Sequence, residues 1–481
     1  MVFNSITFGL FFVCVLLLHY LPIPWRYRKF NLLLASYLFY AAWNPPFVIL
    51  LWISTLVDWQ AAKWIGNSPR QSVRRAALFL SLAVNLGFLC FFKYSSFLLE
   101  NFVALAAAAG IQYQPPVMDI LLPVGISFYT FQTLSYTLDI YRGNSRPWKS
   151  FLDFALYVTF FPQLVAGPIV RATDFLPQCL TPRRASANEL GWGLTLLLLG
   201  LLEKTVLADA LLAPVVESTF NTANIDTVSA WIGTLAFTGQ IFCDFAGYST
   251  CAIGVAMCLG FGLPDNFRFP YSAIGFSDFW RRWHISLSTW LKDYLYIPLG
   301  GNRMGTRRTQ LNLMLTMLIG GLWHGASWTF IIWGGLHGLY LIAERYLKQT
   351  VPARWLFWKT TAGRLMLTAG TFLLVCLTWT VFRAESVSQA AALMQAMLFP
   401  DFLGAFLGQS AGLRVVDSDQ VLLTLGVMSG MLWTHWVMRD STLEDLFERV
   451  PSLCQACAIA AMLTIIVLMP GEDRAFIYFQ F

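Results

Sequence analysis

Charged residues are scarce in this chain. Only 12% of its 481 residues carry a charge, which is about half the fraction of an ordinary soluble domain (roughly 25%), whereas 57% are hydrophobic. This composition excludes a typical soluble globular protein and indicates a protein embedded in the lipid bilayer, without a separate soluble domain. The formal net charge of +6 is spread over short basic loops, so we predict no nucleic-acid partner.

A positively charged segment ahead of the first apolar run is also missing. The first 25 residues contain no Asp, Glu, Lys or Arg, and the first basic cluster, Arg26, Arg28 and Lys29, follows the apolar run. A cleaved signal peptide has the opposite order, with its positive region first. Basic loops stay preferentially in the cytoplasm, so this pattern predicts a retained first span with its basic end inside.

Internal repeats of 20 to 50 residues and inverted halves are not recognisable either. Many secondary transporters are built from two such halves, with ionisable groups at matched positions near the middle of the bilayer. This chain has a single histidine-bearing segment without a counterpart. We therefore favour an enzyme and keep a transporter as the competing class.

Apolar segments recur from one end of the chain to the other. Because a spanning helix takes about 20 residues, they predict an all-α polytopic membrane protein with about 11 transmembrane helices plus re-entrant and interfacial pieces. Proline and glycine interrupt residues 121–143 and 159–175, and non-helical backbone at membrane depth must be buried in protein or line a wet cavity. We expect an internal chamber. Asp139 and Asp244, in or beside apolar runs, are either paired carboxylates or functional groups.

The sequence changes character between residues 264 and 346. Large apolar residues recur at helical spacing within 277–294, while Arg281, Arg282 and Lys292 supply positive charge. This pattern is typical of a helix that lies in the membrane interface. Its basic residues are either membrane anchors or a docking surface for an anionic acyl carrier such as coenzyme A, since Arg and Lys are the side chains that bind phosphate.

His324, in LIGGLWHGASW, lies deep in an apolar segment. An imidazole there needs a hydrogen-bond partner or a wet cavity, and its pKa suits it to take a proton from a hydroxyl or thiol and return it. On one continuous helix, His337 would lie about 20 Å further along, so we expect a packing role for it and no shared metal. Since no Cys or acidic ligand lies at usable spacing, we expect no zinc site. His284 is a second polar candidate.

Two long motifs in this region resemble a known family. WRRWHISLSTWLKDYLYIPLGGNR (residues 280–303) and GGLWHGASWTFIIWGGLHG (residues 320–338) look like the hallmark region of the membrane-bound O-acyltransferases, and in particular of the bacterial alginate O-acetyltransferase branch. The resemblance covers the whole chain, residues 1–481, as one integral-membrane domain with 264–346 as its catalytic histidine region. It implies a ring of tilted helices around a central tunnel, with His324 as the catalytic histidine and His284 as the second motif histidine.

The family resemblance also implies a reaction and its setting. It implies a multi-pass protein of the bacterial inner membrane that takes an acetyl group from a cytoplasmic thioester such as acetyl-coenzyme A, with no bound cofactor. The acetyl group would pass across the membrane to a periplasmic partner of the SGNH-esterase type, which O-acetylates an exopolysaccharide such as alginate. The alternative is direct O-acylation of a lipid or a cell-wall acceptor, such as peptidoglycan or cellulose, without a tyrosyl intermediate.

The chain ends in AFIYFQF (residues 475–481), an uncharged aromatic tail. Chain termini usually fray into water, so such a tail calls for a receiving surface. Tyr478 matches the tyrosine of a terminal motif in related acyl-transfer systems, which implies that it holds the acyl group as an ester between two half-reactions. A phenol with a pKa near 10 needs a base to react, and we expect His324 to supply it. The alternative is an aromatic belt at the membrane interface.

Overall fold

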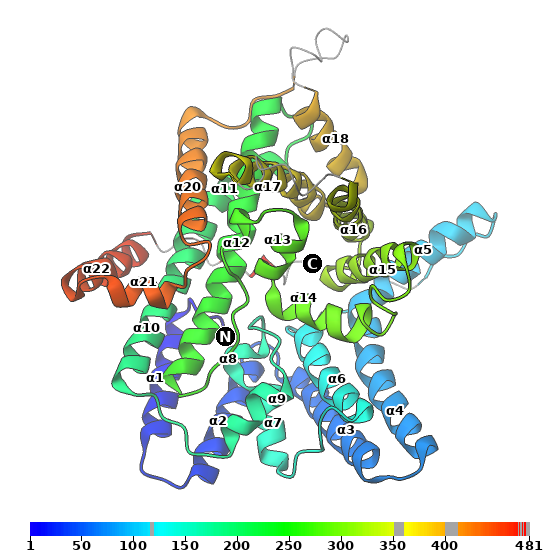
Figure 1. Ribbon diagram of the computed structural model, residues 1–481, viewed down its shortest axis with the longest axis vertical. Coiled ribbons are helices and arrows are strands. Elements are labelled where there is room, and N and C mark those ends of the chain that lie inside the picture. Colours follow the sequence, from blue (N-terminus) through cyan, green and yellow to red (C-terminus); the bar gives the residue numbers. More distant parts are fainter. Residues whose placement is uncertain are drawn as a thin grey trace. The chain divides into compact units, whose positions relative to one another are not determined.

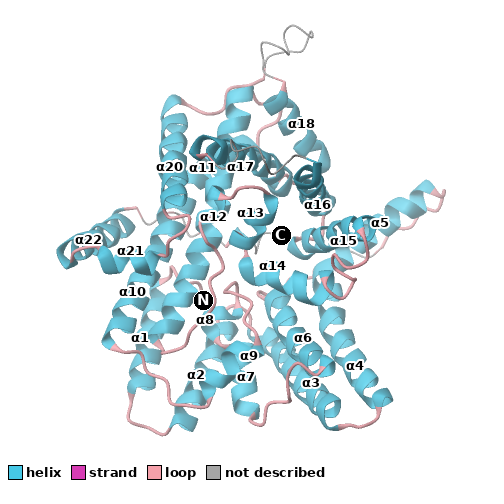
Figure 2. Cartoon of the chain, viewed as in Figure 1, coloured by secondary structure: helices cyan, strands magenta, loops and turns pink. Residues whose placement is uncertain are grey.

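The structure is a computed structural model in which helices and loops make up nearly all of the chain (Figure 2). It describes residues 1–115, 120–350, 360–399, 412–469, 471, 474, 476 and 477. Within those ranges the extended structure is limited to an isolated bridge between Ile225 and Leu413. The all-α prediction is therefore confirmed.

The chain divides into two compact units, whose helices are labelled in Figure 1. The first unit comprises residues 1–197 and 249–264, and the second comprises residues 198–248 and 265–481. The first contains α1 (Ile6–Tyr20), α2 (Trp25–Ala41), α3 (Val48–Asn67), α4 (Gln71–Leu89), α5 (Ser95–Ala108), α6 (Ile126–Arg142), α7 (Phe151–Thr159), α8 (Phe161–Leu164), α9 (Ala172–Phe175) and most of α10 (Ala187–Leu201).

The second unit contains every histidine singled out from the sequence. Its helical elements are the π-helical segment η4 (Leu202–Leu212), α11 (Ala213–Phe220), most of α12 (Thr227–Cys258), α13 (Phe276–Arg282), α14 (Ile285–Leu291), the π-helical turn η6 (Lys292–Tyr296), α15 (Thr306–His324), α16 (Trp328–Thr350), α17 (Thr361–Arg383), α18 (Val387–Leu398), α20 (Ser418–Val437), α21 (Leu443–Arg449) and α22 (Ser452–Leu468).

In the part of the chain that the structure describes, four helical stretches are both long and apolar enough to cross a bilayer. They are Pro45–Asn67, Gln71–Ala108, Thr227–Cys258 and Thr361–Arg383. These stretches are those of a multi-pass membrane protein, and the total of about 11 spans stays a prediction. Other apolar helices are short: α1 has 15 residues and α22 has 17, below the roughly 20 that span the hydrocarbon without tilt or thinning.

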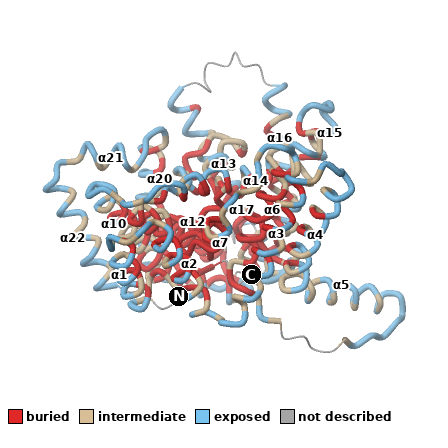
Figure 3. The backbone as a smooth tube through the Cα atoms, turned by 90° about the horizontal axis from the view of Figure 1, so that it is seen from below, coloured by how far each residue is buried: buried red, intermediate tan, exposed pale blue. Residues whose placement is uncertain are grey.

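Burial differs strongly between the helices, as Figure 3 shows. In α12, 83% of the most apolar window is buried. In α22, by contrast, no residue is buried, and Leu453, Val467 and Leu468 are each more than 70% exposed. Apolar side chains that are exposed along a whole helix mark a side that faces the membrane or a partner. The surface of α22 is therefore that of a helix in lipid.

One of the two interrupted segments is buried in protein, which is one of the two settings that the sequence allowed. In the first unit every residue of 160–170 is buried, although only Phe161–Leu164 is helical. Side chains replace part of the missing helical bonding, because the amides of Gln132 and Gln163 donate to the carbonyl oxygen of Tyr157 at 2.6 and 2.7 Å. This backbone is therefore satisfied inside the protein, which is the condition for irregular chain at membrane depth.

Candidate active site

His324 is the last residue of α15, at the tip of a tight helical hairpin. The chain turns at residues 325–327 and returns as α16, so the continuous helix assumed from the sequence for His324 and His337 was wrong. Glycine permits the close crossing, since a Cβ on Gly334 would lie 2.3 Å from the carbonyl oxygen of Met317. The His324 ring is 98% buried and lies 5.0 Å, centroid to centroid, from that of Trp333 on α16.

The helix predicted through 277–294 is also wrong, because it breaks at His284. Helix α13 ends at Arg282 and α14 starts at Ile285, and His284 between them has φ 43° and ψ 54°. A residue other than glycine in this left-handed region is uncommon and is often held there for a function. The break buries His284 completely and places its ring 6.3 Å from the ring of His324, centroid to centroid.

Asn266 fixes the tautomer of His284. The amide oxygen of Asn266 accepts hydrogen bonds from the backbone N–H of Ser286 (3.3 Å) and from its hydroxyl (2.9 Å), which identifies this atom as an acceptor. The same oxygen lies 3.1 Å from Nδ1 of His284, so Nδ1 carries the proton and donates it. Nε2 is then the basic nitrogen of the ring, which is the arrangement that a proton acceptor needs.

Burial lowers the pKa of His284 from its usual 6.5 to about 3, so the ring is neutral at pH 7. The unfolded chain takes up a proton at this residue between pH 6.5 and 3, and the folded chain does not. Stability therefore falls as the pH drops through this window, by about 1.4 kcal/mol per pH unit for this group. We expect the Tm of the detergent-purified protein to fall less between pH 7.5 and 5 in His284→Gln than in the parent; equal slopes would contradict this assignment.

His337 has the environment of a packing residue. Thr378 donates its hydroxyl proton to the carbonyl oxygen of Val375, so Nε2 of His337, 3.1 Å from that hydroxyl, is the donor between them. The imidazole stacks on Phe279 at an interplanar angle of 9°. No group of three or more His, Cys, Asp or Glu residues suited to a metal occurs in the part of the chain that the structure describes.

The end of the chain approaches the histidine pair. Phe476 is 99% buried, and its ring centroid lies 5.6 Å from that of Phe245 on α12. His284 is also a neighbour of Phe245, at 4.6 Å between ring centroids. Tyr478 lies outside the described residues, but Ile477 directly before it is buried in the same unit. Phe476 is therefore linked to His284 through the ring of Phe245.

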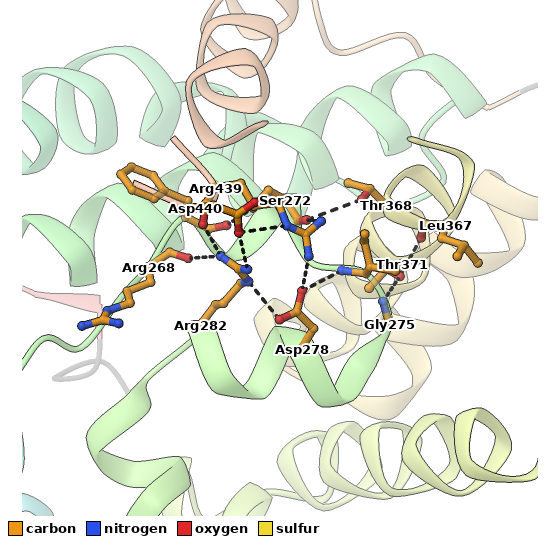
Figure 4. A network of polar contacts seen from close by, with 12 residues as sticks. Arg268, Ser272, Gly275, Asp278, Arg282, Leu367, Thr368, Thr371, Arg439 and Asp440 are labelled. Carbon is orange, nitrogen blue, oxygen red and sulfur yellow. Dashed lines mark hydrogen bonds and ion pairs between the residues drawn. The ribbon is translucent and has the colours of Figure 1, made fainter. Parts of the chain in front are cut away.

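Arg282, predicted to bind the acyl donor, also contacts protein groups (Figure 4). Its guanidinium pairs with Asp278 at 3.0 Å and donates to the carbonyl oxygen of Arg439 at 2.8 Å. Asp278 in turn pairs with Arg439 at 2.8 Å. This network fixes the end of α13, two residues before His284. Arg281 and Lys292 are exposed.

Comparisons with known proteins agree with this picture. The family model of the membrane-bound O-acyltransferases matches residues 144–377. A probable alginate O-acetylase of Pseudomonas putida is 41% identical over 436 residues, which cover 88% of this chain and 86% of that protein. The chain belongs to the membrane-bound O-acyltransferase family. As a member of it, the protein is an acyltransferase in a membrane setting.

Other relatives extend the same family. A probable alginate O-acetylase of Azotobacter vinelandii is 42% identical over 82% of this chain and 78% of its own. A peptidoglycan O-acetyltransferase of Helicobacter pylori is 36% identical over 77% of this chain and 74% of its own. The acyltransferase region matched by the family model contains His284, His324 and also Asn266, which the sequence analysis did not single out.

Proposed function

We propose that this acyltransferase takes an acetyl group from a cytoplasmic thioester such as acetyl-coenzyme A and passes it across the membrane for O-acetylation of an exopolysaccharide such as alginate. The observation that carries the proposal is a row of buried rings that runs from Phe476 through Phe245 and His284 to His324. The names of the relatives support acetyl as the acyl group and a polymer as the acceptor.

Tyr478 is the proposed acceptor of the first half-reaction. His324 removes the phenol proton while the oxygen attacks the thioester carbonyl carbon; the C–S bond breaks, an aryl ester forms, and the imidazolium returns the proton to the leaving thiolate. The neutral His284, oriented by Asn266, lies beside His324 and presents Nε2 as an acceptor. The aryl ester is reactive enough to pass its acetyl group to the next acceptor.

The second half-reaction is assigned to a periplasmic partner of the SGNH-esterase type. The protein would act in the bacterial inner membrane as a single catalytic domain of residues 1–481, a ring of about 11 tilted helices around a tunnel. Direct acylation of a lipid or cell-wall acceptor is the competing reading, and it needs no tyrosyl ester. No bound cofactor or metal enters either scheme.

The proposal is tested by incubating the purified protein with acetyl-coenzyme A labelled in the acetyl group. We expect thiol release in a first turnover that matches the amount of label retained on the protein. Thiol release without retained label, and with transfer to an added hydroxyl acceptor, would support direct acylation. Neither thiol release nor transfer would refute acetyl-coenzyme A as the donor.

Arg281 and Lys292 are the two exposed residues among the three candidates, with Arg282, for contacts with the phosphates of the donor. Both are exposed, so each contributes modestly and in a salt-dependent way. We expect the double variant Arg281→Gln with Lys292→Gln to raise the KM for acetyl-coenzyme A about threefold to tenfold, with kcat unchanged. The rise should vanish at 1 M salt. An unchanged KM at low salt would limit these residues to membrane anchoring.

A further inference from the structure

A buried charge cluster lies next to the C-terminal segment. Lys204 and Asp209 on the π-helical segment η4 and Asp244 on α12 are each more than 90% buried. The ammonium group of Lys204 pairs with Asp209 at 2.9 Å and with Asp244. The sequence left open whether Asp244 is a paired carboxylate or a functional group, and the structure shows that it is paired. One cation facing two buried carboxylates is a costly arrangement that packing alone does not require.

The Asp244 carboxylate faces the backbone of the chain end. The second carboxylate oxygen of Asp244 accepts a hydrogen bond from the backbone N–H of Ile477 at 2.7 Å, inside the protein. Charge-assisted hydrogen bonds of this kind are short and about twice as strong as neutral ones. Because the donor is a backbone group, this contact sets the position of the chain along its own direction, whatever side chain residue 477 carries.

Two further contacts hold the same segment. Gly471 has φ +67°, and a Cβ on it would lie 2.7 Å from the carbonyl oxygen of Thr205 in η4. Arg474 forms an ion pair with Glu217 on α11. The segment is therefore held at residues 471, 474 and 477 by the same stretch of chain, η4 with α11, and by the adjoining α12. A π-helical segment is rare and often marks a functional position.

We propose that Lys204, Asp209 and Asp244 form a tail dock that holds the backbone at Ile477 and so sets the register of the chain end relative to His284 and His324. The proposal rests on the proposed function, in which Tyr478 receives the acetyl group. The members of the tail dock are positioning residues, since Asp244 bonds to the backbone of the tail and Lys204 pairs with both carboxylates.

The test compares Asp244→Leu with Gly471→Ala, which disturbs the docked segment without changing a charge. Carboxypeptidase is added to the full-length protein in detergent, and trimming is followed by intact mass. We expect trimming beyond Ile477 to be about tenfold faster or more in both variants than in the parent, because digestion follows the open population. We expect acetyl labelling of the tail to be about 10²-fold slower, with an unchanged KM for acetyl-coenzyme A.

Asp226→Leu is the matched control. Like Asp244→Leu, it deletes a buried, ion-paired carboxylate of the second unit. The partner of Asp226 is Arg414, and Asp226 does not contact the tail. Equal trimming of the parent and both dock variants, or equally fast trimming in Asp226→Leu, would overturn the tail dock. Faster trimming with unchanged acetyl labelling would show that the tail dock holds the tail but does not set the register that acetyl transfer needs. Absence of labelling in the parent would refute the tyrosyl relay, while trimming would still decide whether the dock holds the tail.

Discussion

Replacing His324 with glutamine is expected to lower the rate of acetyl transfer by about 10²–10⁴-fold. Glutamine has a similar size and can form hydrogen bonds, but it cannot take up and return a proton. His324 is 98% buried at the turn of the α15–α16 hairpin and faces the ring of His284 at 6.3 Å. The measurement is single-turnover thiol release from acetyl-coenzyme A, with equal amounts of correctly folded protein.

His337→Gln is the matched control for this prediction. His337 lies on the other arm of the same hairpin and is fully buried, and its Nε2 is used by Thr378. A glutamine amide can replace that donor, so we expect this variant to keep most of the parent's rate. Equal losses in the two variants would show that the hairpin needs both imidazoles for packing, and the assignment of His324 as the base would be wrong.

Tyr478→Phe is expected to abolish retention of the acetyl label on the protein and to stop transfer to the polymer. Phenylalanine keeps the aromatic ring and removes only the hydroxyl group that would carry the ester. Thiol release should fall to the background rate of thioester hydrolysis. The measurement is label retained per protein molecule after one turnover, together with O-acetyl groups found on the polymer.

Tyr271→Phe provides the comparison for the hydroxyl group. Tyr271 is a buried tyrosine of the same unit, and its hydroxyl donates to the carbonyl oxygen of Thr238 at 2.6 Å. Losing that hydrogen bond should cost about 1 kcal/mol of stability and leave labelling intact. If acetyl labelling survives in Tyr478→Phe but disappears in Tyr271→Phe, the residue that carries the acetyl group lies outside the tail.

The chemistry of the site was more predictable than its geometry. An imidazole in an apolar segment is costly, so His324 could be singled out from the sequence, whereas the role predicted for His284 came from the family resemblance. The spacing of apolar residues, however, predicted unbroken helices through both histidines. It carries no signal for a left-handed residue other than glycine, such as His284, and α13 and α14 are separate for that reason.

Partners that are distant in sequence were not predictable either. Asn266 lies 18 residues before His284 and reaches it only because the chain folds back, so no motif spacing reveals the pair. Asp244 was recognisable as an unusual buried carboxylate, but its partners come from Lys204 and from a backbone group 233 residues further along. Such contacts depend on the tertiary structure, which periodicity and composition do not encode.

The relay through the tail is tested most directly by mass analysis of the C-terminal peptide after incubation of the protein with labelled acetyl-coenzyme A. We predict an acetyl group on Tyr478 in the parent and none in His324→Ala or Tyr478→Phe. The absence of an adduct, under conditions in which a hydroxyl acceptor still becomes acetylated, would contradict the relay. Transfer would then be direct at His324, and the aromatic tail would serve as an anchor.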